Sequence, residues 1–450
     1  MPAVKISIIG GGSAYMTAMF SSLARLAREG GLAGSRIALM DIDIENVELM
    51  GRWAQAVVKK HDLPLSFSCT TDLEAALDGA DFVLSTFRAA GLAHRYLDET
   101  IPLKYGELGN ETVGVGGVFM ALRCIPKALA LVEAMQRRCP HAWLINYTNP
   151  VHMVTEASIR AGHERTIGLC DGVYGVQWLA CKLLKIPVSR AGEIEAHVAG
   201  VNHCTWALKL FHQDRDLYAE MDGLIAAADL SGAGGYETIG GTELNEVEAD
   251  ACRLYRYYGL LPGSIYYARY YYNLRKLMAH LQAADHQHRS RWLMQRAAAK
   301  REGIYAQLES GDVSFAAYDE EDASHGDQAI GAIHAIANDT GEPATANVLN
   351  RGAVPNLPDD AVVEVGCILG KDGARPTAAG ALPLAVQGMV RAAHDFGRLT
   401  VQAAMTGDRK LVLQAAMAHP AHRDLDAIEK VIEEMFEAHM GHLPQFLDQP

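Results

Sequence analysis

The sequence predicts an α/β fold with a doubly wound parallel sheet in its first part and a mixed α+β domain in its second. Short apolar stretches alternate with helical patterns up to about residue 170. That alternation is typical of parallel strands joined by crossover helices. Beyond residue 170 the pattern becomes mixed, with strand-like stretches among longer helical ones. We therefore expect two domains, residues 1–170 and residues 171–450.

Six strands are expected in the first domain, at residues 4–9, 36–40, 65–69, 81–86, 142–146 and 165–169. Each is short and apolar, and helical patterns lie between most of them. In the second domain, residues 194–210 and 361–369 are strand-like, and helical patterns cover residues 172–184, 244–258, 266–283, 286–309, 325–337 and 381–440. The glycine-rich residues 231–241 predict a loop, which either borders the site or is a plain surface linker.

The composition is that of a soluble protein with a large core. Of the 450 residues, 49% are hydrophobic, and the net charge is −14. Nucleic acids and anionic membranes need basic surfaces, so neither is expected as a partner. No apolar stretch approaches the length of a membrane span. The eight cysteines are scattered without a C-x-x-C pair, which predicts reduced thiols and a cytoplasmic location.

The first strand runs directly into a glycine turn and a helical pattern. Gly10, Gly12 and Ser13 lie in that turn, where a pyrophosphate can approach the backbone and helix N–H groups bind its charge. The second strand ends at Asp41, whose carboxylate can accept hydrogen bonds from the ribose of NAD and would repel the 2′-phosphate of NADP. Tyr15 stands in place of the third glycine of the usual fingerprint. We expect an NAD site in a Rossmann-like domain, with a purely structural turn as the alternative.

Polar residues gather at the ends of the later strands, where ligands bind in open α/β sheets. They are Arg88 and Arg95 after the fourth strand, Glu111 in the next glycine-rich loop, Asn146 and Asn149 after the fifth strand, and Cys170 and Asp171 after the sixth. The amide of Asn146 suits the nicotinamide of the cofactor or a substrate hydroxyl. Cys170 and His203 suit an open metal site. From spacing alone, a core cysteine and a hydrogen-bonded histidine explain these two residues better.

An ordered set of motifs runs through nearly the whole chain. They are GGGS-x-Y, D-I-D, F-R-x-x-G, D-E-x-I-P-L-K-Y-G, G-N-E-T-x-G-x-G-G, N-Y-T-N-P, G-L-C-D and G-V-N-H, followed by further motifs at 347–360, 363–365 and 399–420. Together they resemble glycoside hydrolase family 4, the NAD- and manganese-dependent glycosidases. The chain departs from the family pattern at Asn110, at Gly366 and in the tetrad of residues 170–173, which leaves the subgroup open.

The resemblance implies a fold like that of lactate and malate dehydrogenases, with NAD and Mn²⁺ as cofactors. In the family's reaction NAD oxidises C3 of the sugar, a base removes the proton on C2, the aglycone leaves by elimination, water adds and the hydride returns. Cys170 and His203 match the metal ligands. The metal holds O2 and O3 and stabilises the charge that develops on the carbonyl oxygen.

The same resemblance assigns the acid and the base. Tyr267 matches the tyrosine that serves as base, with Tyr266 as the neighbouring alternative, although tyrosines on one helix also serve packing. Asp171 would protonate the leaving group, unless it only caps the helix that follows.

Several residues bear on substrate binding. Arg95 falls where relatives bind the phosphate of 6-phosphorylated sugars. Further substrate-binding candidates are Arg88, Asn149, Arg269 and Glu111. Since arginine binds such groups in a bidentate manner, a phosphate, sulfonate or carboxylate at C6 is expected. Ion pairs with Asp98 and Glu99 are the alternative use of these arginines.

A 2-hydroxy-acid dehydrogenase of the malate/lactate dehydrogenase type is the alternative function. The long second half and the Cys170–His203 pair argue against it. The expected partner is a small-molecule glycoside, and the chain is expected to form a homodimer or homotetramer. The sugar, the anomer and the aglycone stay open at this level.

Overall fold

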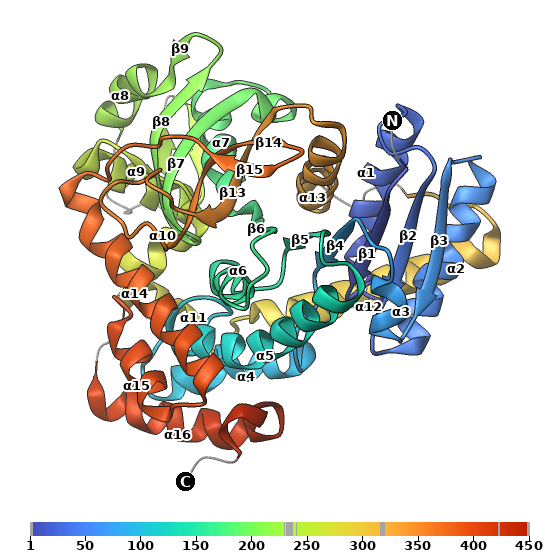
Figure 1. The fold of residues 1–450 in the computed structure, drawn as a ribbon. Coiled ribbons are helices and arrows are strands. Elements are labelled where there is room, and N and C mark those ends of the chain that lie inside the picture. The colour runs from blue at the N-terminus through green and yellow to red at the C-terminus, as the bar shows by residue number, and fades with distance from the viewer. Residues whose placement is uncertain are drawn as a thin grey trace.

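A computed structural model describes residues 3–228, 230, 237–239, 241–315, 320–421 and 424–447, without the side chains of residues 237–238 and 320–327. Most of the glycine-rich stretch predicted as a loop, residues 231–236 and 240, lies outside this description. Helices and strands alternate through the first part of the chain, as predicted (Figure 1).

The first part contains six strands with crossover helices between them. Its elements are β1 (Lys5–Ile9), α1 (Met16–Arg28), β2 (Ser35–Met40), α2 (Ile44–Lys60), β3 (Leu65–Thr70), α3 (Leu73–Leu77), β4 (Phe82–Ser85), α4 (Gly91–Lys104), α5 (Gly114–Arg138), β5 (Trp143–Asn146), α6 (Val151–Arg160) and β6 (Thr166–Gly168). All six predicted strands are confirmed. Their β-branched and aromatic residues favour a buried pleated sheet.

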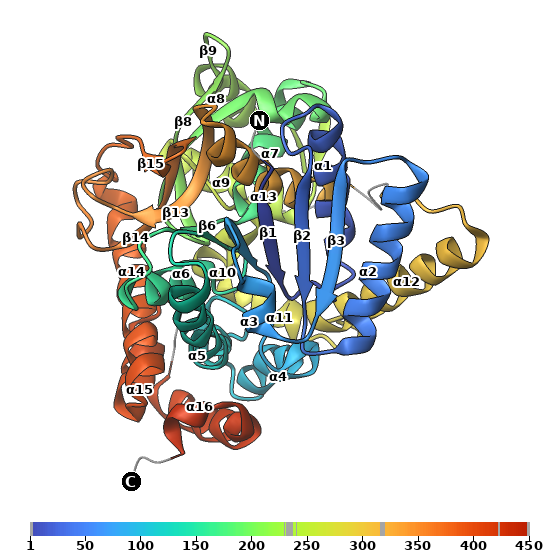
Figure 2. The same ribbon diagram turned by 45° about the vertical axis from the view of Figure 1, so that its right-hand side comes forward.

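The six strands are parallel and lie in the order β3-β2-β1-β4-β5-β6, the order of a doubly wound dinucleotide-binding sheet. Three antiparallel strands from the second half extend it: β13 (Glu342–Leu349), β14 (Val362–Gly370) and β15 (Gly373–Pro376). One nine-stranded sheet therefore crosses the boundary expected at residue 170 (Figure 2).

The sequence pattern missed β13, whose second residue is Pro343. Proline argues against a strand with partners on both sides. Pro343 pairs with Ile368 of β14, whereas β13 meets β6 only at Asn347. Pro343 is tolerated because it lies where β13 has one neighbour only.

The second part forms two smaller sheets and a set of helices. The first sheet is four-stranded and consists of β7 (Ile194–Val201), β8 (Cys204–His212), β9 (Arg215–Asp216) and β12 (Leu261–Pro262). The second is a pair of β10 (Glu237–Ile239) and β11 (Thr242–Leu244). The helices of this part are α7 (Tyr174–Leu184), α8 (Leu217–Ala227), α9 (Glu246–Tyr258), α10 (Ile265–Tyr272), α11 (Leu274–Leu281), α12 (Arg289–Ser310), α13 (Glu320–Asn338), α14 (Leu384–Thr406), α15 (Arg409–Ala418) and α16 (Leu425–His439). Short 3-10 helices lie at Asp171–Val173, Val188–Glu193, Met440–His442 and Pro444–Phe446.

The stretch 194–210, predicted as one strand-like region, is a hairpin of β7 and β8. Its turn consists of Asn202 and His203, and His203 has a positive φ of 66°. The helical pattern of residues 266–283 divides at Asn273, and the pattern of 381–440 forms three helices. These breaks depend on local capping and tertiary packing, which apolar periodicity does not report.

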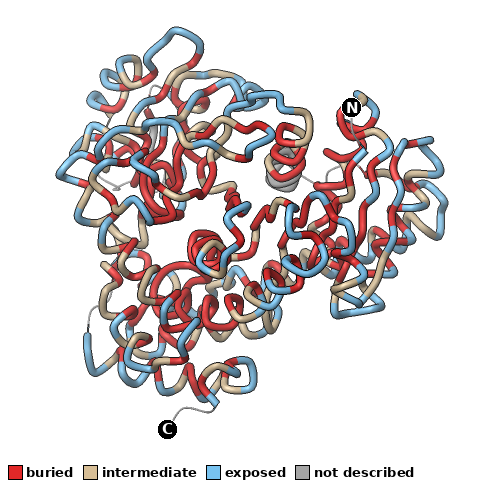
Figure 3. Tube along the Cα trace, viewed as in Figure 1, coloured by how far each residue is buried: buried red, intermediate tan, exposed pale blue. Residues whose placement is uncertain are grey.

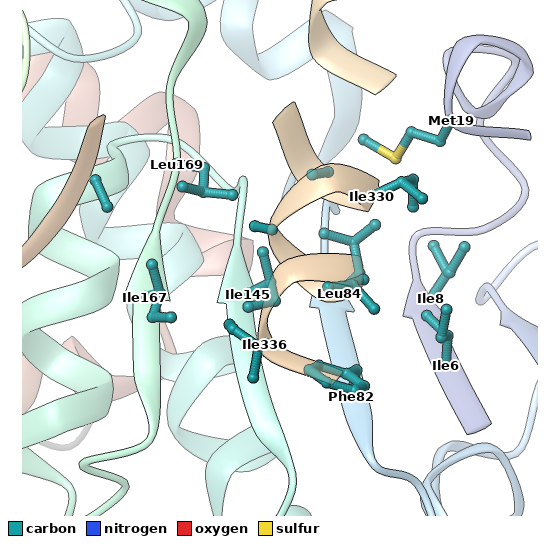
Figure 4. Close-up of a cluster of buried hydrophobic side chains, with 14 of the residues drawn as sticks. Ile6, Ile8, Met19, Phe82, Leu84, Ile145, Ile167, Leu169, Ile330 and Ile336 are labelled. Carbon is teal, nitrogen blue, oxygen red and sulfur yellow. The ribbon is translucent and has the colours of Figure 1, made fainter. Parts of the chain in front are cut away.

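The largest core lies between the sheet and helices α1 and α13. Figure 4 shows Ile330 and Ile336 of α13 over the strand residues Leu84 and Ile145, with Met19 of α1 beside them. Buried residues follow the sheet and the helices packed on it (Figure 3). Among the described residues one helix, α5, is long and apolar enough to cross a membrane, and 78% of its apolar window is buried inside the protein. Such burial is typical of a core helix.

His152 links the packing to a pH dependence of stability. His152 is buried on α6, and its ring packs closely against Gly397 of α14. A Cβ added to Gly397 would lie only 2.5 Å from the His152 Nε2 atom. Neither ring nitrogen has a hydrogen-bond partner among the described residues. Burial, with smaller contributions from His203 and His394, lowers the pKa of His152 to about 3.

We expect His152 to weaken the fold in acid. The pKa of His152 is lower in the folded chain than the unfolded value of about 6.5. The neutral ring therefore stabilises the fold in full above pH 6.5, and this stabilisation declines as the pH falls towards 3. At pH 5 the free energy of unfolding should be lower by about 2 kcal/mol. Urea unfolding at pH 7.5 and pH 5 measures it. His152→Leu should show a smaller decline between the two pH values, and an equal decline would contradict this prediction.

Candidate active site

The glycine turn lies where β1 and β2 end, at the edge of the sheet that carries the other predicted residues. Gly10 has φ 98°, and a Cβ there would lie 2.9 Å from the backbone nitrogen of Phe87. Only glycine fits both constraints. No side chain caps the first turn of α1, so its N–H groups suit an anion. Ser13 is partly exposed beside them.

Asp41 follows β2 and contacts the glycine turn directly. The Gly12 N–H donates to its Oδ2 at 3.0 Å, and the Asp43 N–H donates to its Oδ1 at 3.2 Å. A Cβ on Gly12 would lie 2.9 Å from Asp41 Oδ2. The structure therefore brings Gly10, Gly12, Ser13 and Asp41 together, as predicted.

Asn146 is the last residue of β5, and Asn149 follows three residues later in different surroundings. Asn146 is fully buried; its Nδ2 donates to the carbonyl oxygens of Thr148 (3.3 Å) and Val151 (3.2 Å), and its Oδ1 accepts from the Thr148 N–H at 3.1 Å. Asn146 thus organises the loop, and a nicotinamide contact by its side chain would need these bonds to break. Asn149 is partly exposed, precedes a cis peptide bond to Pro150, and accepts from Thr112 Oγ1 at 3.4 Å.

Cys170 and His203 meet, although 33 positions separate them in the chain. Cys170 follows β6, and the hairpin turn between β7 and β8 presents His203 to it. The Cys170 Sγ atom lies 3.4 Å from His203 Nε2 and 3.9 Å from Asp171 Oδ1. Both Cys170 and His203 are buried. Burial raises the pKa of the Cys170 thiol well above its usual range and lowers the pKa of His203 to about 4.

The carboxylate of Glu364, which is bonded to the neighbour of His203, Asn202, was not assigned a role from the sequence. Glu364 of β14 is buried and accepts from Asn202 Nδ2 at 2.9 Å and from Asn347 Nδ2 at 3.0 Å. Burial raises the pKa of Glu364 to about 7. The available signal was a single glutamate within an otherwise apolar strand, since such a residue needs polar partners inside the fold.

Tyr267 of α10 completes the group around His203. The two rings stack with centroids 3.4 Å apart and an interplanar angle of 14°. Burial raises the pKa of the Tyr267 phenol well above its usual range, and the charges of Glu111, Cys170 and Asp171 add to this effect. The Tyr266 side chain is 45% exposed and packs near Gly175, on another side of α10. The geometry distinguishes the two tyrosines.

Arg95 and Glu111 form a buried network beside Tyr267. Arg95 pairs through Nη1 with Glu111 Oε2 at 2.5 Å and through Nε with Glu99 Oε1 at 2.8 Å. Arg88 lies 3.5 Å from Glu111 Oε2. Burial alone would lower the pKa of Arg95, but Glu111 and Glu99 together raise it. The alternative of an ion pair is thus observed for Arg95 with Glu99, whereas Asp98 pairs with Arg123 at 2.5 Å.

Arg269 faces a cavity next to this network. The cavity has a volume of about 360 Å³ and is lined by cationic, aromatic and polar residues. They include Arg269, Arg289, His280, His286, His288 and Trp292. Within the described residues, Arg269 Nε has no hydrogen-bond partner, and its Nη2 lies 3.8 Å from Glu246. The cavity also reaches Glu99, Asn110 and Tyr270, which connect it to Arg95 and Tyr267.

Comparison with known proteins identifies the family. The model described as "Family 4 glycosyl hydrolase" matches residues 5–186, and the model of its C-terminal domain matches residues 198–422. The chain belongs to family 4 of the glycosyl hydrolases. It is 32% identical to a probable 6-phospho-beta-glucosidase of Bacillus subtilis over 450 residues, covering 99% of this chain and 98% of the relative.

Solved structures agree with this family 4 fold. A 6-phospho-alpha-glucosidase from gut microorganisms, in complex with NAD and Mn²⁺, superimposes with a TM-score of 0.86 at 25% identity, covering 99% of this chain and all of that one. A lactate dehydrogenase from a deep-sea metagenome matches with a TM-score of 0.55 at 12% identity, which concerns the fold alone. The expected dehydrogenase-like fold is confirmed, and family membership argues against the dehydrogenase function.

Proposed function

We propose that this family 4 protein is an NAD- and Mn²⁺-dependent glycosidase for a glycoside with an anionic group on C6 of the sugar, a phosphate in the first instance. The convergence of Cys170, His203 and Tyr267 carries the proposal, because these residues come from three distant segments and a packed core has no need for them together. The names of the relatives, which include 6-phospho-glucosidases of both anomeric types, support the substrate class.

The glycine turn fits the dinucleotide. Gly10 and Gly12 allow close approach to the backbone, and the uncapped first turn of α1 offers N–H donors to the pyrophosphate. Asp41 stands next to the turn with a carboxylate that suits ribose hydroxyls. These residues would hold NAD.

Cys170 and His203 fit a divalent cation. Because ligand bonds measure about 2.0–2.3 Å, two ligand atoms 3.4 Å apart can contact the same ion. In the described part of the chain, no third His, Cys, Asp or Glu joins them in a group that could hold a metal. The remaining ligands would therefore be oxygens of substrate and water, which manganese prefers. Buried Asn202 Oδ1 and Glu364 Oε2, which lack a hydrogen-bond partner among the described residues, agree with a site that gains polar partners when loaded.

When bound, the two groups would supply reversible hydride transfer at C3 and a Lewis acid for the sugar hydroxyls. Tyr267 supplies the base for the proton on C2. Burial and neighbouring anions keep its phenol protonated in the protein alone. A divalent charge held by Cys170 and His203 would offset that repulsion and favour the Tyr267 phenolate, the form that can accept a proton.

We assign the protonation of the departing oxygen to Asp171. It begins the 3-10 helix after Cys170, it is partly exposed, and its Oδ1 atom lies 3.9 Å from Cys170 Sγ. A carboxyl group so close to Cys170 would lie near a substrate held at the metal site. The acid matters most for leaving groups that are poor without protonation.

The anionic group on C6 is assigned to the cavity of Arg269 and Arg289. Arg95 has its charge matched by Glu99 and Glu111, so a further anion on it would add repulsion from two carboxylates. The cavity presents two arginines and three histidines, and Glu99 is the one carboxylate among its described lining residues. Its aromatic residues can pack on the sugar or the aglycone.

The compartment and the assembly are also proposals. The eight cysteines are free in the structure, which is usual in a reducing cytoplasm. We propose a cytoplasmic enzyme that forms a homodimer or homotetramer, and size-exclusion chromatography with light scattering tests the assembly.

A panel of nitrophenyl glycosides tests the function. We expect NAD-loaded, Mn²⁺-loaded protein to hydrolyse 6-phosphoglycosides at least about tenfold more efficiently than neutral ones, because a charge-assisted hydrogen bond is worth about 1.5–3 kcal/mol. Arg269→Met should lower this preference while the melting temperature stays unchanged. Equal kcat/KM for neutral and phosphorylated sugars would contradict the anionic substrate class. Hydrolysis that persists without NAD would contradict the function itself.

A further inference from the structure

Three buried side chains connect the two segments that carry Cys170 and His203. Glu364 on β14, Asn347 on β13 and Asn202 in the turn between β7 and β8 are 1%, 0% and 2% exposed. Glu364 Oε1 accepts from Asn202 Nδ2 at 2.9 Å and from Asn347 Nδ2 at 3.0 Å. One carboxylate oxygen therefore bonds to both amides at once.

The Asn347 side of this group reaches the strand that leads to Cys170. Asn347 pairs with Glu364 across β13 and β14 and with Gly168 across β13 and β6, so the three residues lie in one row across the sheet. Asn347 Nδ2 donates to the Gly168 carbonyl oxygen at 3.4 Å, and a Cβ on Gly168 would lie only 3.0 Å from the Asn347 Cβ. Since Cys170 follows two residues after Gly168, a shift of Asn347 would displace the strand end that presents Cys170.

The Asn202 side of the group reaches His203. Asn202 directly precedes His203 in the hairpin turn, and His203 has a positive φ of 66°. A residue other than glycine rarely adopts this conformation and keeps it only where its surroundings hold it. β14 packs against β7, and the bond from Asn202 to Glu364 ties the turn to the large sheet. Glu364 therefore restrains the turn that directs the His203 ring towards Cys170.

We propose that Glu364 is a positioning residue for the metal site: it holds Cys170 and His203 at the spacing that one divalent cation requires. Their ligand atoms lie 3.4 Å apart before any cation binds. A cation accepts only small deviations in its ligand distances, so side chains that orient its ligands contribute to its affinity. The inference rests on the proposed metal site and adds to it the side chains that preorganise its two ligands.

Manganese titration of the NAD-loaded protein tests the assignment, with the free ion followed by its paramagnetic signal. We expect Glu364→Leu to weaken Mn²⁺ binding by about 10–100-fold, because it removes the acceptor that both amides share. Glu364→Gln should stay within about threefold of the wild type, because it keeps an oxygen for the two amides. Its new amide can also donate to Asn202 Oδ1 or Asn347 Oδ1, which have no hydrogen-bond partner within the described residues.

Asn347→Ala and Asn350→Ala form a matched pair of further variants. Both asparagines are fully buried, one in β13 and one directly after it. Asn350 bonds only within its own loop, to Val354, Leu357 and Pro358. Both changes should lower the melting temperature, whereas only Asn347→Ala should weaken Mn²⁺ binding.

Three results would overturn the proposal. Unchanged Mn²⁺ affinity in Glu364→Leu would mean that Glu364 does not set the ligand spacing. An equal loss in Glu364→Leu and Glu364→Gln would mean that Glu364 acts through its charge and not through its hydrogen bonds. Should Glu364→Leu fail to fold, equal Mn²⁺ affinities of Asn347→Ala and Asn350→Ala would decide against the proposal. A wild-type protein that binds no Mn²⁺ would instead contradict the proposed metal site, so the two failures are distinguishable.

Discussion

Replacing Cys170 with serine is expected to lower kcat/KM by about three orders of magnitude, because losing one preorganised electrostatic contact in an active site costs about 10²–10³ and the Lewis acid is lost with it. A hydroxyl is a far weaker anionic ligand than a thiolate, which a bound cation deprotonates outright. Manganese affinity, followed by the paramagnetic signal of the free ion, should fall in parallel. The melting temperature should change little.

Cys181→Ser is the matched control for this change. Cys181 is also a free, buried cysteine, but it lies on α7 in the core of the second domain. The kcat/KM of Cys181→Ser should stay within about twofold of the wild type, as expected for a residue that does not touch the site. Full activity of Cys170→Ser after exhaustive chelation would refute the metal assignment and leave the remaining chemistry open.

Replacing Tyr267 with phenylalanine should lower kcat by about 10²–10⁴-fold, the usual contribution of one acid–base group. The change removes the hydroxyl and keeps the ring that stacks on His203. Cofactor affinity and the melting temperature should therefore stay close to the wild-type values, while the rate of proton removal falls.

Tyr266→Phe is the control, because that tyrosine lines the cavity of Arg269 but does not stack on His203. The kcat of Tyr266→Phe should stay within about twofold of the wild type, because the substitution keeps the ring and is not expected to remove an acid–base group. An active Tyr267→Phe together with an inactive Tyr266→Phe would move the base to the neighbouring residue.

Local patterns predicted the sheet well because its strands are short, apolar and separated by helices. The strand ends also located Gly10, Asp41 and Cys170 at one edge, since parallel strands end on the same side. The spacing of Cys170 and His203 gave only weak evidence for a pair. The pair was predicted from the resemblance of the motifs to family 4. Contact between residues so far apart depends on the hairpin turn, whose position within 194–210 the pattern did not resolve.

The hydrogen-bond and ion-pair partners of several site residues come from distant segments, so the sequence pattern did not predict them. The strand-end position of Asn146 predicted a contact with the nicotinamide or a substrate hydroxyl, yet its amide is bonded within its own loop. Arg95 matched a phosphate position, yet two carboxylates neutralise it. The role of Glu364 depends on Asn202 and Asn347, which come from other strands and hairpins. A pattern identifies residue types, whereas partner geometry decides how each is used.

Turnover in heavy water tests the central claim most directly. If the sugar is deprotonated at C2 during each cycle, the released sugar should carry deuterium at C2, as seen by NMR or mass spectrometry, with no net formation of NADH. Protein stripped of NAD should release no product. Hydrolysis by NAD-free protein, with protium retained at C2, would contradict the account.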